Sequence, residues 1–175
     1  SCKAIMTQEK LMKVLHYDED TGIFTWIADG RYKRTGTTAR TMDSHGYIVV
    51  RIEGQNFKAH RLAWLYVFGC LPAGDLDHKN CIRHDNRISN LRIATKSQNA
   101  ANRPSRTKRP KGICFTKGKW QVSAGKNMKS VYGGRYDTEN EASSVFIKLS
   151  RRLHGEFTST NQYNWEKYPL RPFPM

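Results

Sequence analysis

The sequence predicts an α+β protein built from two small modules. Segments 46–52 and 119–124 alternate apolar and polar residues with the period of a β-strand. Segments 60–68 and 139–152 instead place their apolar residues at helical spacing. Between these patterns, residues 103–110 are basic, contain two prolines and show no apolar periodicity, which is the composition of a linker.

Charge favours a polyanionic partner. The 175 residues include 30 Lys+Arg against 15 Asp+Glu, a formal net charge of +15, and nucleic acid is the usual partner of such a chain. A membrane surface is the alternative. No apolar run approaches the roughly 18 residues of a spanning helix, however, and no signal peptide is visible. We therefore expect double-stranded DNA, and no membrane, as the partner.

The cysteines do not predict a metal site or a disulfide framework. None of the four forms a C-x-x-C pair, so a zinc site is not expected. Scattered thiols are typical of a reducing compartment, which predicts a cytoplasmic protein. The four residues are Cys2, Cys70, Cys81 and Cys114.

The first module is expected to contain two helices, several short strands and the start of a third helix. Gly69 follows the second helix in the position that ends helices in a left-handed conformation. Thr95 and Gln98 have the spacing of a capping box. The expected elements are a helix at 8–15, a turn at 18–22, a strand at 23–26, a hairpin of 46–52 with 57–59, a helix at 60–68, strands at 76–79 and 91–94, and a helix from 95.

The second module is expected to be a three-stranded antiparallel sheet packed on one helix. Its strands are predicted at 112–115, 119–124 and 130–136. Thr138 and Glu141 form a capping box at the start of a helix that runs to about Arg152. The apolar stripe of this helix should cover the Trp120 face of the sheet and leave the opposite, polar face free.

Residues 74–99 combine a histidine, carboxylates and amides in a way that a buried core does not. Hydrolysis of a phosphodiester needs a base for the attacking water and positive charge for the oxyanion that leaves. His78 can be the base because its ordinary pKa lies near neutrality. Asp77 and Asn99 offer hard oxygen ligands, which suit Mg²⁺ or Mn²⁺. The alternative is that Asp77, Asn86 and Asn90 only cap turns.

Asp77 and His78 are neighbours on a predicted strand. Neighbouring strand residues point to opposite faces of a sheet. The two can therefore serve one site only if the strand is irregular or ends there, and the polar run that follows favours an end.

The order Asp77-His78, then Asn90, then Asn99, resembles the signature of the HNH nucleases. Ala59-His60-Arg61-Leu62-Ala63-Trp64 resembles a segment that precedes this signature in homing endonucleases of phages and introns. The resemblance implies a β-hairpin and helix around one metal (ββα-metal, or His-Me finger). It also implies that His78 activates water, that Asp77 and Asn99 bind the metal, and that Asn90 braces the loop and the histidine. It further implies a phage- or intron-encoded protein acting in the cytoplasm of a bacterial host.

The second module resembles the plant ethylene-response-factor (Apetala-type) DNA-binding domain. The matching segments are 111–113, 119–120, 132–138 and 141–142. This resemblance implies that the free face of the sheet enters a major groove. The chain departs from that family at Cys114, Ser123 and Ser130, where charged residues are usual, so the sequence preference of the family does not transfer.

Several residues are expected to contact DNA. His60 is either turned to the scissile phosphate or a hydrogen-bonded structural residue, and the basic linker either follows the phosphate backbone or is a solvated tether. The expected contacts are His60, Arg61, Arg106, Lys108, Arg109, Lys111, Lys119, Gln121, Ser123, Ser130 and Tyr132.

The sequence thus predicts a homing-type, metal-dependent DNA endonuclease, monomeric or homodimeric. The alternative is a catalytically inactive regulator that binds specific DNA sequences. The expected organisation is a nuclease domain at 1–102, a basic linker at 103–110, a DNA-binding domain at 111–162 and an extended tail at 163–175.

Overall fold

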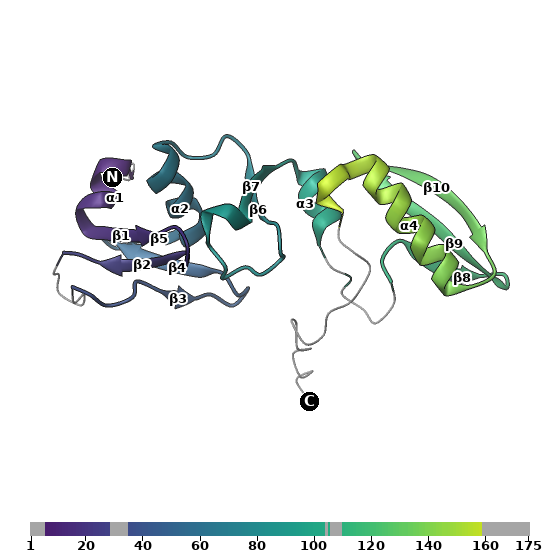
Figure 1. The fold of residues 1–175 in the computed structure, drawn as a ribbon, viewed down its shortest axis with the longest axis horizontal. Coiled ribbons are helices and arrows are strands. Elements are labelled where there is room, and N and C mark those ends of the chain that lie inside the picture. Colours follow the sequence, from purple (N-terminus) through teal and green to yellow (C-terminus); the bar gives the residue numbers. More distant parts are fainter. Residues whose placement is uncertain (1–5, 29–34, 104, 106–109, 159–175) are drawn as a thin grey trace, which may run out of the picture. The chain divides into compact units, whose positions relative to one another are not determined.

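The computed structural model describes residues 6–28, 35–103, 105 and 110–158, and its fold is mixed α+β with several small antiparallel sheets (Figure 1). The chain divides into two compact units, Ser1–Thr95 and Lys96–Met175. Within the described ranges, none of the helices combines the length and the apolar character needed to cross a membrane.

The first unit holds two helices, three small sheets and one 3₁₀ turn. Its sheets are the β1–β2 hairpin, the β3–β4–β5 sheet and the β6–β7 pair, all antiparallel. In chain order the elements are α1 (Gln8–Val14), β1 (Leu15–Asp18), β2 (Ile23–Trp26), β3 (Thr41–Met42), β4 (Ile48–Ile52), β5 (Gln55–Lys58), α2 (Ala59–Phe68), β6 (Asp75–His78), η1 (Ile88–Asn90) and β7 (Leu91–Ala94).

The core of the first unit lies between α1, α2 and the strands β1, β2 and β4. The alternation of β4 buries Ile48, Val50 and Ile52 on one face, as the strand period predicts. Leu11 and Leu62 meet that face and are almost fully buried. The predicted end of α2 is confirmed: Gly69 has φ of +73° and donates its N–H to the Leu65 carbonyl at 3.0 Å.

Two strands of this unit were not expected, the short β3 and β1. The sequence predicts a helix through Leu15, but α1 ends at Val14 and β1 begins at Leu15. Leu15 and Tyr17 are buried while His16 and Asp18 are exposed, so the strand period replaces the helical one as soon as β2 is there to pair with. The resulting hairpin positions Tyr17 in the interior.

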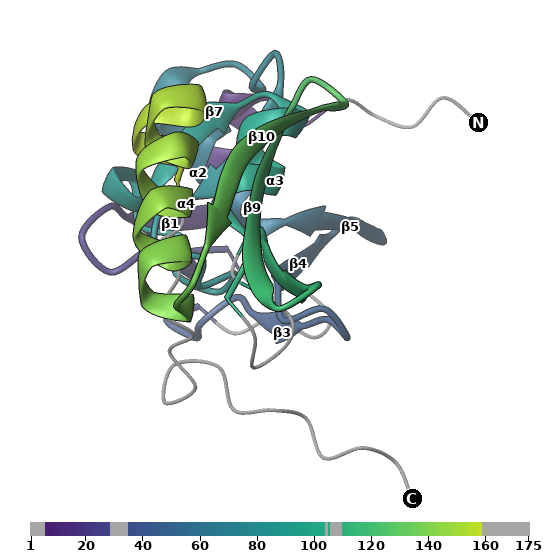
Figure 2. The same ribbon diagram turned by 90° about the vertical axis from the view of Figure 1, so that its right-hand side faces the viewer.

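The second unit is a three-stranded antiparallel sheet with α4 lying along one face (Figure 2). Val122, Ala142 and Phe146 form its core with the partly buried Trp120 and Leu149. This is the sheet-on-helix arrangement that the sequence predicts. The elements are α3 (Lys96–Asn102), β8 (Ile113–Thr116), β9 (Lys119–Lys126), β10 (Lys129–Tyr136), α4 (Glu139–His154) and η2 (Gly155–Phe157), with sheet order β10–β9–β8.

The capping box of α4 is confirmed. The Thr138 Oγ1 accepts the Glu141 N–H at 3.3 Å, and a Glu141 carboxylate oxygen accepts the Thr138 N–H at 3.2 Å. These reciprocal bonds satisfy two backbone donors that the first turn of a helix otherwise leaves without partners. The capping box therefore sets the start of α4 at Glu139, directly after Thr138.

Helix α3 is held to the second unit. Ser97 Oγ accepts the Asn127 N–H at 3.3 Å. The Lys111 ammonium donates to the carbonyls of Ala100, Ala101 and Arg103 at 2.7, 2.9 and 3.0 Å, which caps the C-terminal end of α3. The compact units accordingly divide between residues 95 and 96, ahead of the basic linker expected at 103–110.

Candidate functional site

His78 is the last residue of β6 and its ring is buried, with 5% of its surface exposed. The chain turns at once: the His78 carbonyl accepts the Cys81 N–H at 2.8 Å, and Cys81 has a positive φ of 61°. The strand therefore ends at His78, as the polar run after it indicates. The ring lies against two aromatic neighbours, with centroid distances of 5.2 Å to His60 and 6.0 Å to Tyr47.

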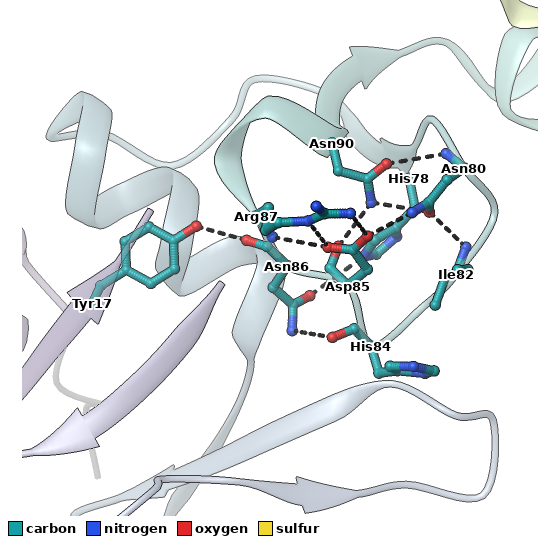
Figure 3. Close-up of polar contacts among 9 residues, drawn as sticks. All are labelled: Tyr17, His78, Asn80, Ile82, His84, Asp85, Asn86, Arg87 and Asn90. Atoms are coloured by element: carbon teal, nitrogen blue, oxygen red, sulfur yellow. Dashed lines mark hydrogen bonds and ion pairs between the residues drawn. The ribbon is translucent and has the colours of Figure 1, made fainter. Parts of the chain in front are cut away.

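An amide fixes the tautomer of His78. The Asn86 Oδ1 lies 3.3 Å from the His78 Nε2 (Figure 3). The Asn86 Nδ2 donates to the His84 carbonyl at 3.4 Å, which sets the orientation of the amide. Because an amide oxygen only accepts, Nε2 carries the proton and Nδ1 keeps its lone pair. The neutral imidazole can then act as a base through Nδ1.

Burial lowers the pKa of His78 below its ordinary value, because the charged imidazolium is poorly solvated there. The hydrogen bond from Asn86 and the charges of Asp77 and Asp85 act in the opposite direction. The net direction keeps the ring unprotonated at neutral pH. This is the state that a general base requires before it takes a proton.

Asp77 is placed differently from His78. Asp77 is 5% exposed, and its Oδ2 accepts a hydrogen bond from the Arg92 Nε at 2.9 Å. The Arg92 Nη2 lies 2.9 Å from the same oxygen as an ion pair. Asp77 and Arg92 are direct partners in the β6–β7 register. The structure thus brings an acid and an imidazole together at one strand end, with the acid held by a buried guanidinium.

Asn90 makes three hydrogen bonds to the loop that follows β6. Its side chain accepts the Asn80 N–H at 3.1 Å and donates to the Asn80 Oδ1 at 3.0 Å and to the Asp85 carbonyl at 2.8 Å. The Asp85 carboxylate in turn accepts from Asn80 and makes two contacts with Arg87, and the Arg87 contacts lower the pKa of Asp85 to about 2 (Figure 3). Asn90 therefore acts on the loop, whereas Asn86 contacts the imidazole.

His60 opens α2 and is buried beside His78. Its Nδ1 has no hydrogen-bond partner among the described residues. Burial lowers the pKa of His60 to about 3, and the nearby His78, Arg61 and Lys58 act in the same direction while Asp43 opposes them. Both expectations for His60, a residue turned to the scissile phosphate and a hydrogen-bonded structural residue, stay predictions.

Basic side chains that sequence reasoning missed gather around Tyr47. The Lys58 ammonium lies 5.0 Å and the Arg83 guanidinium 5.1 Å from the centroid of the Tyr47 ring. Lys58 also pairs with Asp43, and Arg83 donates to the His45 carbonyl at 2.7 Å. The sequence does not predict this cluster, because Arg83 is 38 positions away from His45 and only tertiary packing brings the two together.

The second unit presents one polar face of its sheet. The register pairs Tyr132 with Ser123 and Ser130 with Gly125, so the predicted Gln121, Ser123, Ser130 and Tyr132 share a face with Lys119. A bulge at Gly133 then shifts β10 by one residue, and Arg135 comes opposite Gln121. Arg135 therefore joins this face, which we call the outer face, although unbroken alternation from Ser130 and Tyr132 would place it on the helix side.

Three groups of predicted site residues belong to the second unit or lie outside the described residues. Asn99 is a half-buried residue of α3 in the second unit. Lys111 uses its ammonium on the end of α3, and its contact with DNA stays a prediction. Arg106, Lys108 and Arg109, with the tail from 163, lie outside the described residues.

The donor chemistry of the predicted ligands fits a hard cation. Within the described ranges, no three His, Cys, Asp or Glu side chains gather as a metal cage would need. Carboxylate and amide oxygens, such as those of Asp77 and of Asn99, are donors that Mg²⁺ accepts, usually with few protein ligands and the remaining positions filled by water and phosphate. Softer metals would require thiolate or several imidazole ligands.

A buried imidazole lies next to an acid at a strand end and close to several cations. General-base catalysis on an anionic substrate requires groups of these kinds. Comparison with protein families gives the class: residues 57–101, from β5 into α3, match the family described as HNH endonuclease. The match supports an HNH nuclease domain and DNA as its substrate. No curated protein and no solved structure matches the chain.

His60 predicts a pH dependence of stability. A pKa of about 3 in the folded protein against 6.5 when exposed means that the unfolded chain binds more protons between these values. The free energy of unfolding should therefore fall as pH falls below 6.5, by up to about 1.4 kcal/mol per pH unit for this group. Urea titrations from pH 7 to pH 4 measure the slope. His60→Phe should flatten it, and the exposed His84→Phe should not.

Proposed function

We propose that this protein is a metal-dependent endonuclease of the HNH homing type that hydrolyses a phosphodiester bond in double-stranded DNA. The observation that carries the proposal is the His78 ring, which is buried, neutral and held in one tautomer by Asn86 within the segment that matches the HNH family. The ββα-metal arrangement is proposed with it, with β6 and β7 as its two strands.

The reaction assigned to this site needs one proton acceptor. His78 Nδ1 takes a proton from a water molecule, the water oxygen bonds to phosphorus, and the bond from phosphorus to the leaving deoxyribose oxygen breaks. Asn86 stabilises the imidazolium that forms, because its Oδ1 already accepts from Nε2. Asn90 keeps the loop that carries Asn86 in place through Asn80 and Asp85.

Asp77 and Asn99 are the proposed ligands of Mg²⁺ or Mn²⁺. When bound, such an ion polarises the phosphate and stabilises the negative charge that develops on the leaving oxygen. Arg92 holds the Asp77 carboxylate in one orientation through two contacts at 2.9 Å. Removing Arg92 would therefore disturb the ligand as well as its charge balance.

Basic residues around the imidazoles are proposed to contact the substrate backbone. Arg61 follows His60 on α2, and Lys58 and Arg83 flank Tyr47, which itself lies 6.0 Å from His78. A phosphate that approaches His78 would be attracted by these cations, since phosphate contacts supply most of the affinity of proteins for DNA.

The outer face of the second unit is proposed to bind the target. It carries Lys119, Gln121, Tyr132 and Arg135 on one side of a sheet whose other side is covered by α4. A sheet of this width can enter the major groove, and its polar side chains can reach base edges there.

A plasmid-nicking assay tests the proposed function. Purified protein with supercoiled plasmid and Mg²⁺ should convert it to nicked or linear DNA, and EDTA should abolish the conversion. Mg²⁺ added in excess of EDTA should restore it, which controls for damage to the protein. Binding without conversion under every metal tried would favour the inactive regulator instead.

A further inference from the structure

The N-terminal hairpin contacts the main chain of the loop that holds His78. The Tyr17 hydroxyl of β1 donates to the Asn86 carbonyl at 2.6 Å across a separation of 69 residues (Figure 3). Both residues are buried, at 3% and 2% exposed. Burial, together with the nearby Glu19, raises the pKa of Tyr17 above its ordinary value. The hydroxyl therefore stays a donor at any pH at which the site could work.

The turn of the same hairpin makes a second, independent contact with this loop. Gly22 has φ of +72°, and a Cβ atom built on it would lie 2.4 Å from the Arg87 nitrogen and 2.6 Å from the Asn86 carbonyl carbon. Only a glycine combines this backbone conformation with so close an approach. The peptide that joins Asn86 to Arg87 is thus contacted on its carbonyl by the Tyr17 hydroxyl, and the backbone of Gly22 packs against it.

The hairpin contacts Asn86, the residue whose side chain orients the His78 imidazole. The Asn86 carbonyl receives the Tyr17 hydroxyl, while the side chain of the same residue accepts from His78 Nε2. Loss of the Tyr17 hydroxyl removes from a buried carbonyl the donor that the structure gives it. A shift of that carbonyl would move the amide, and the ring would lose its fixed tautomer.

We propose that Tyr17 and Gly22 position the general base, acting through Asn86. This rests on the proposed function of His78 and extends it beyond residues 57–101, the segment that matches the nuclease family. The hairpin is then part of the site machinery and not only a cover for the N-terminal core. Tyr17 is a positioning residue, because it contacts neither the ring of His78 nor, by this proposal, the substrate.

The substitution Tyr17→Phe tests the proposal with little change in packing, because the ring keeps its contacts with Phe24 at 4.7 Å and Tyr66 at 5.7 Å. We expect the maximal rate of DNA cleavage to fall about 10- to 100-fold, the size expected when a catalytic group is displaced by about 1 Å. The KM for DNA should stay within about twofold, since no group that contacts DNA has been removed.

A spectroscopic measurement on the free protein separates positioning from a general loss of structure. The long-range ¹H–¹⁵N spectrum of the His78 ring at a fixed pH of about 8 reports its tautomer. The unaltered protein should show the Nε2–H form, and Tyr17→Phe should show a mixture. Thermal unfolding of both proteins shows whether the variant is folded.

Tyr66→Phe is the matched control. It makes the same change in the same aromatic cluster, and no described hydrogen bond involves its hydroxyl. It should leave both the cleavage rate and the His78 spectrum unchanged. If Tyr17→Phe behaves like Tyr66→Phe in both measurements, the positioning proposal is wrong even if the protein cleaves DNA. If the unaltered protein does not cleave DNA, the proposed function fails while the spectrum still tests the contact.

Discussion

Replacing His78 with alanine should lower the rate of DNA cleavage by about 10²–10⁴-fold, the range that general-base catalysis contributes. The reason is the geometry of the ring, whose Nε2 is held by Asn86 so that Nδ1 is left as the proton acceptor. Single-turnover cleavage of a supercoiled plasmid measures the rate. A mobility-shift assay should show DNA affinity within about twofold of the original, because an uncharged buried ring contributes little to phosphate binding.

The matched control for this variant is His84→Ala. His84 lies in the same loop, but its side chain is exposed and only its carbonyl takes part in the site, as the acceptor of the Asn86 amide. This variant should cleave normally. Full activity of the His78 variant, or an equal loss in both variants, would remove His78 from the role of base and leave the family match without its catalytic residue.

Replacing Arg135 with alanine should weaken DNA binding by roughly 5- to 150-fold if the guanidinium contacts a base pair in two places. Arg135 lies opposite Gln121 on the outer face, beyond the bulge at Gly133. A loss that depends on DNA sequence would indicate a base contact. A uniform loss, with the salt dependence of binding reduced by about one unit of slope, would indicate a phosphate contact.

Lys119→Ala and Lys148→Ala are the variants with which the loss of DNA affinity in Arg135→Ala is compared. Lys119 shares the outer face but pairs with Asp137 at 3.0 Å, so its removal should cost less affinity than that of Arg135. Lys148 is exposed on α4, the helix that covers the opposite face of the sheet. Its removal should leave affinity unchanged. If Lys148→Ala weakens binding more than Arg135→Ala, the helix side and not the outer face meets DNA.

Much of the fold could be predicted because it is decided within a few neighbouring residues. The capping box of Thr138 and Glu141 and the left-handed Gly69 depend on contacts only three or four positions away. The alternation of β9 follows from the period of two in its own residues. The strand β1 could not be predicted in the same way. Leu15 belongs to the apolar pattern of the preceding helix, yet Leu15–Asp18 forms a strand because β2 pairs with it.

The residues of the candidate site also fall into two groups, those that the sequence could predict and those that it could not. His78, Asp77 and Asn90 could be singled out by residue type and order, since few purposes other than chemistry place such groups so close together. The partner of the His78 imidazole, Asn86, could not be singled out in this way. Asn86 stands among several amides of one loop, and nothing in its spacing distinguishes it from Asn80 or Asn90.

By itself the sequence determined the kinds of groups available, the period of each long element and the positive charge of the chain. These follow from residue chemistry and from contacts close in the chain. Tertiary structure alone decided that Asn86 contacts His78, that Tyr17 holds Asn86 from 69 residues away, and that the bulge at Gly133 turns Arg135 outward. A hydrogen bond requires two particular atoms within about 3 Å and in line, and periodicity fixes the face of an element but not the atom that it meets.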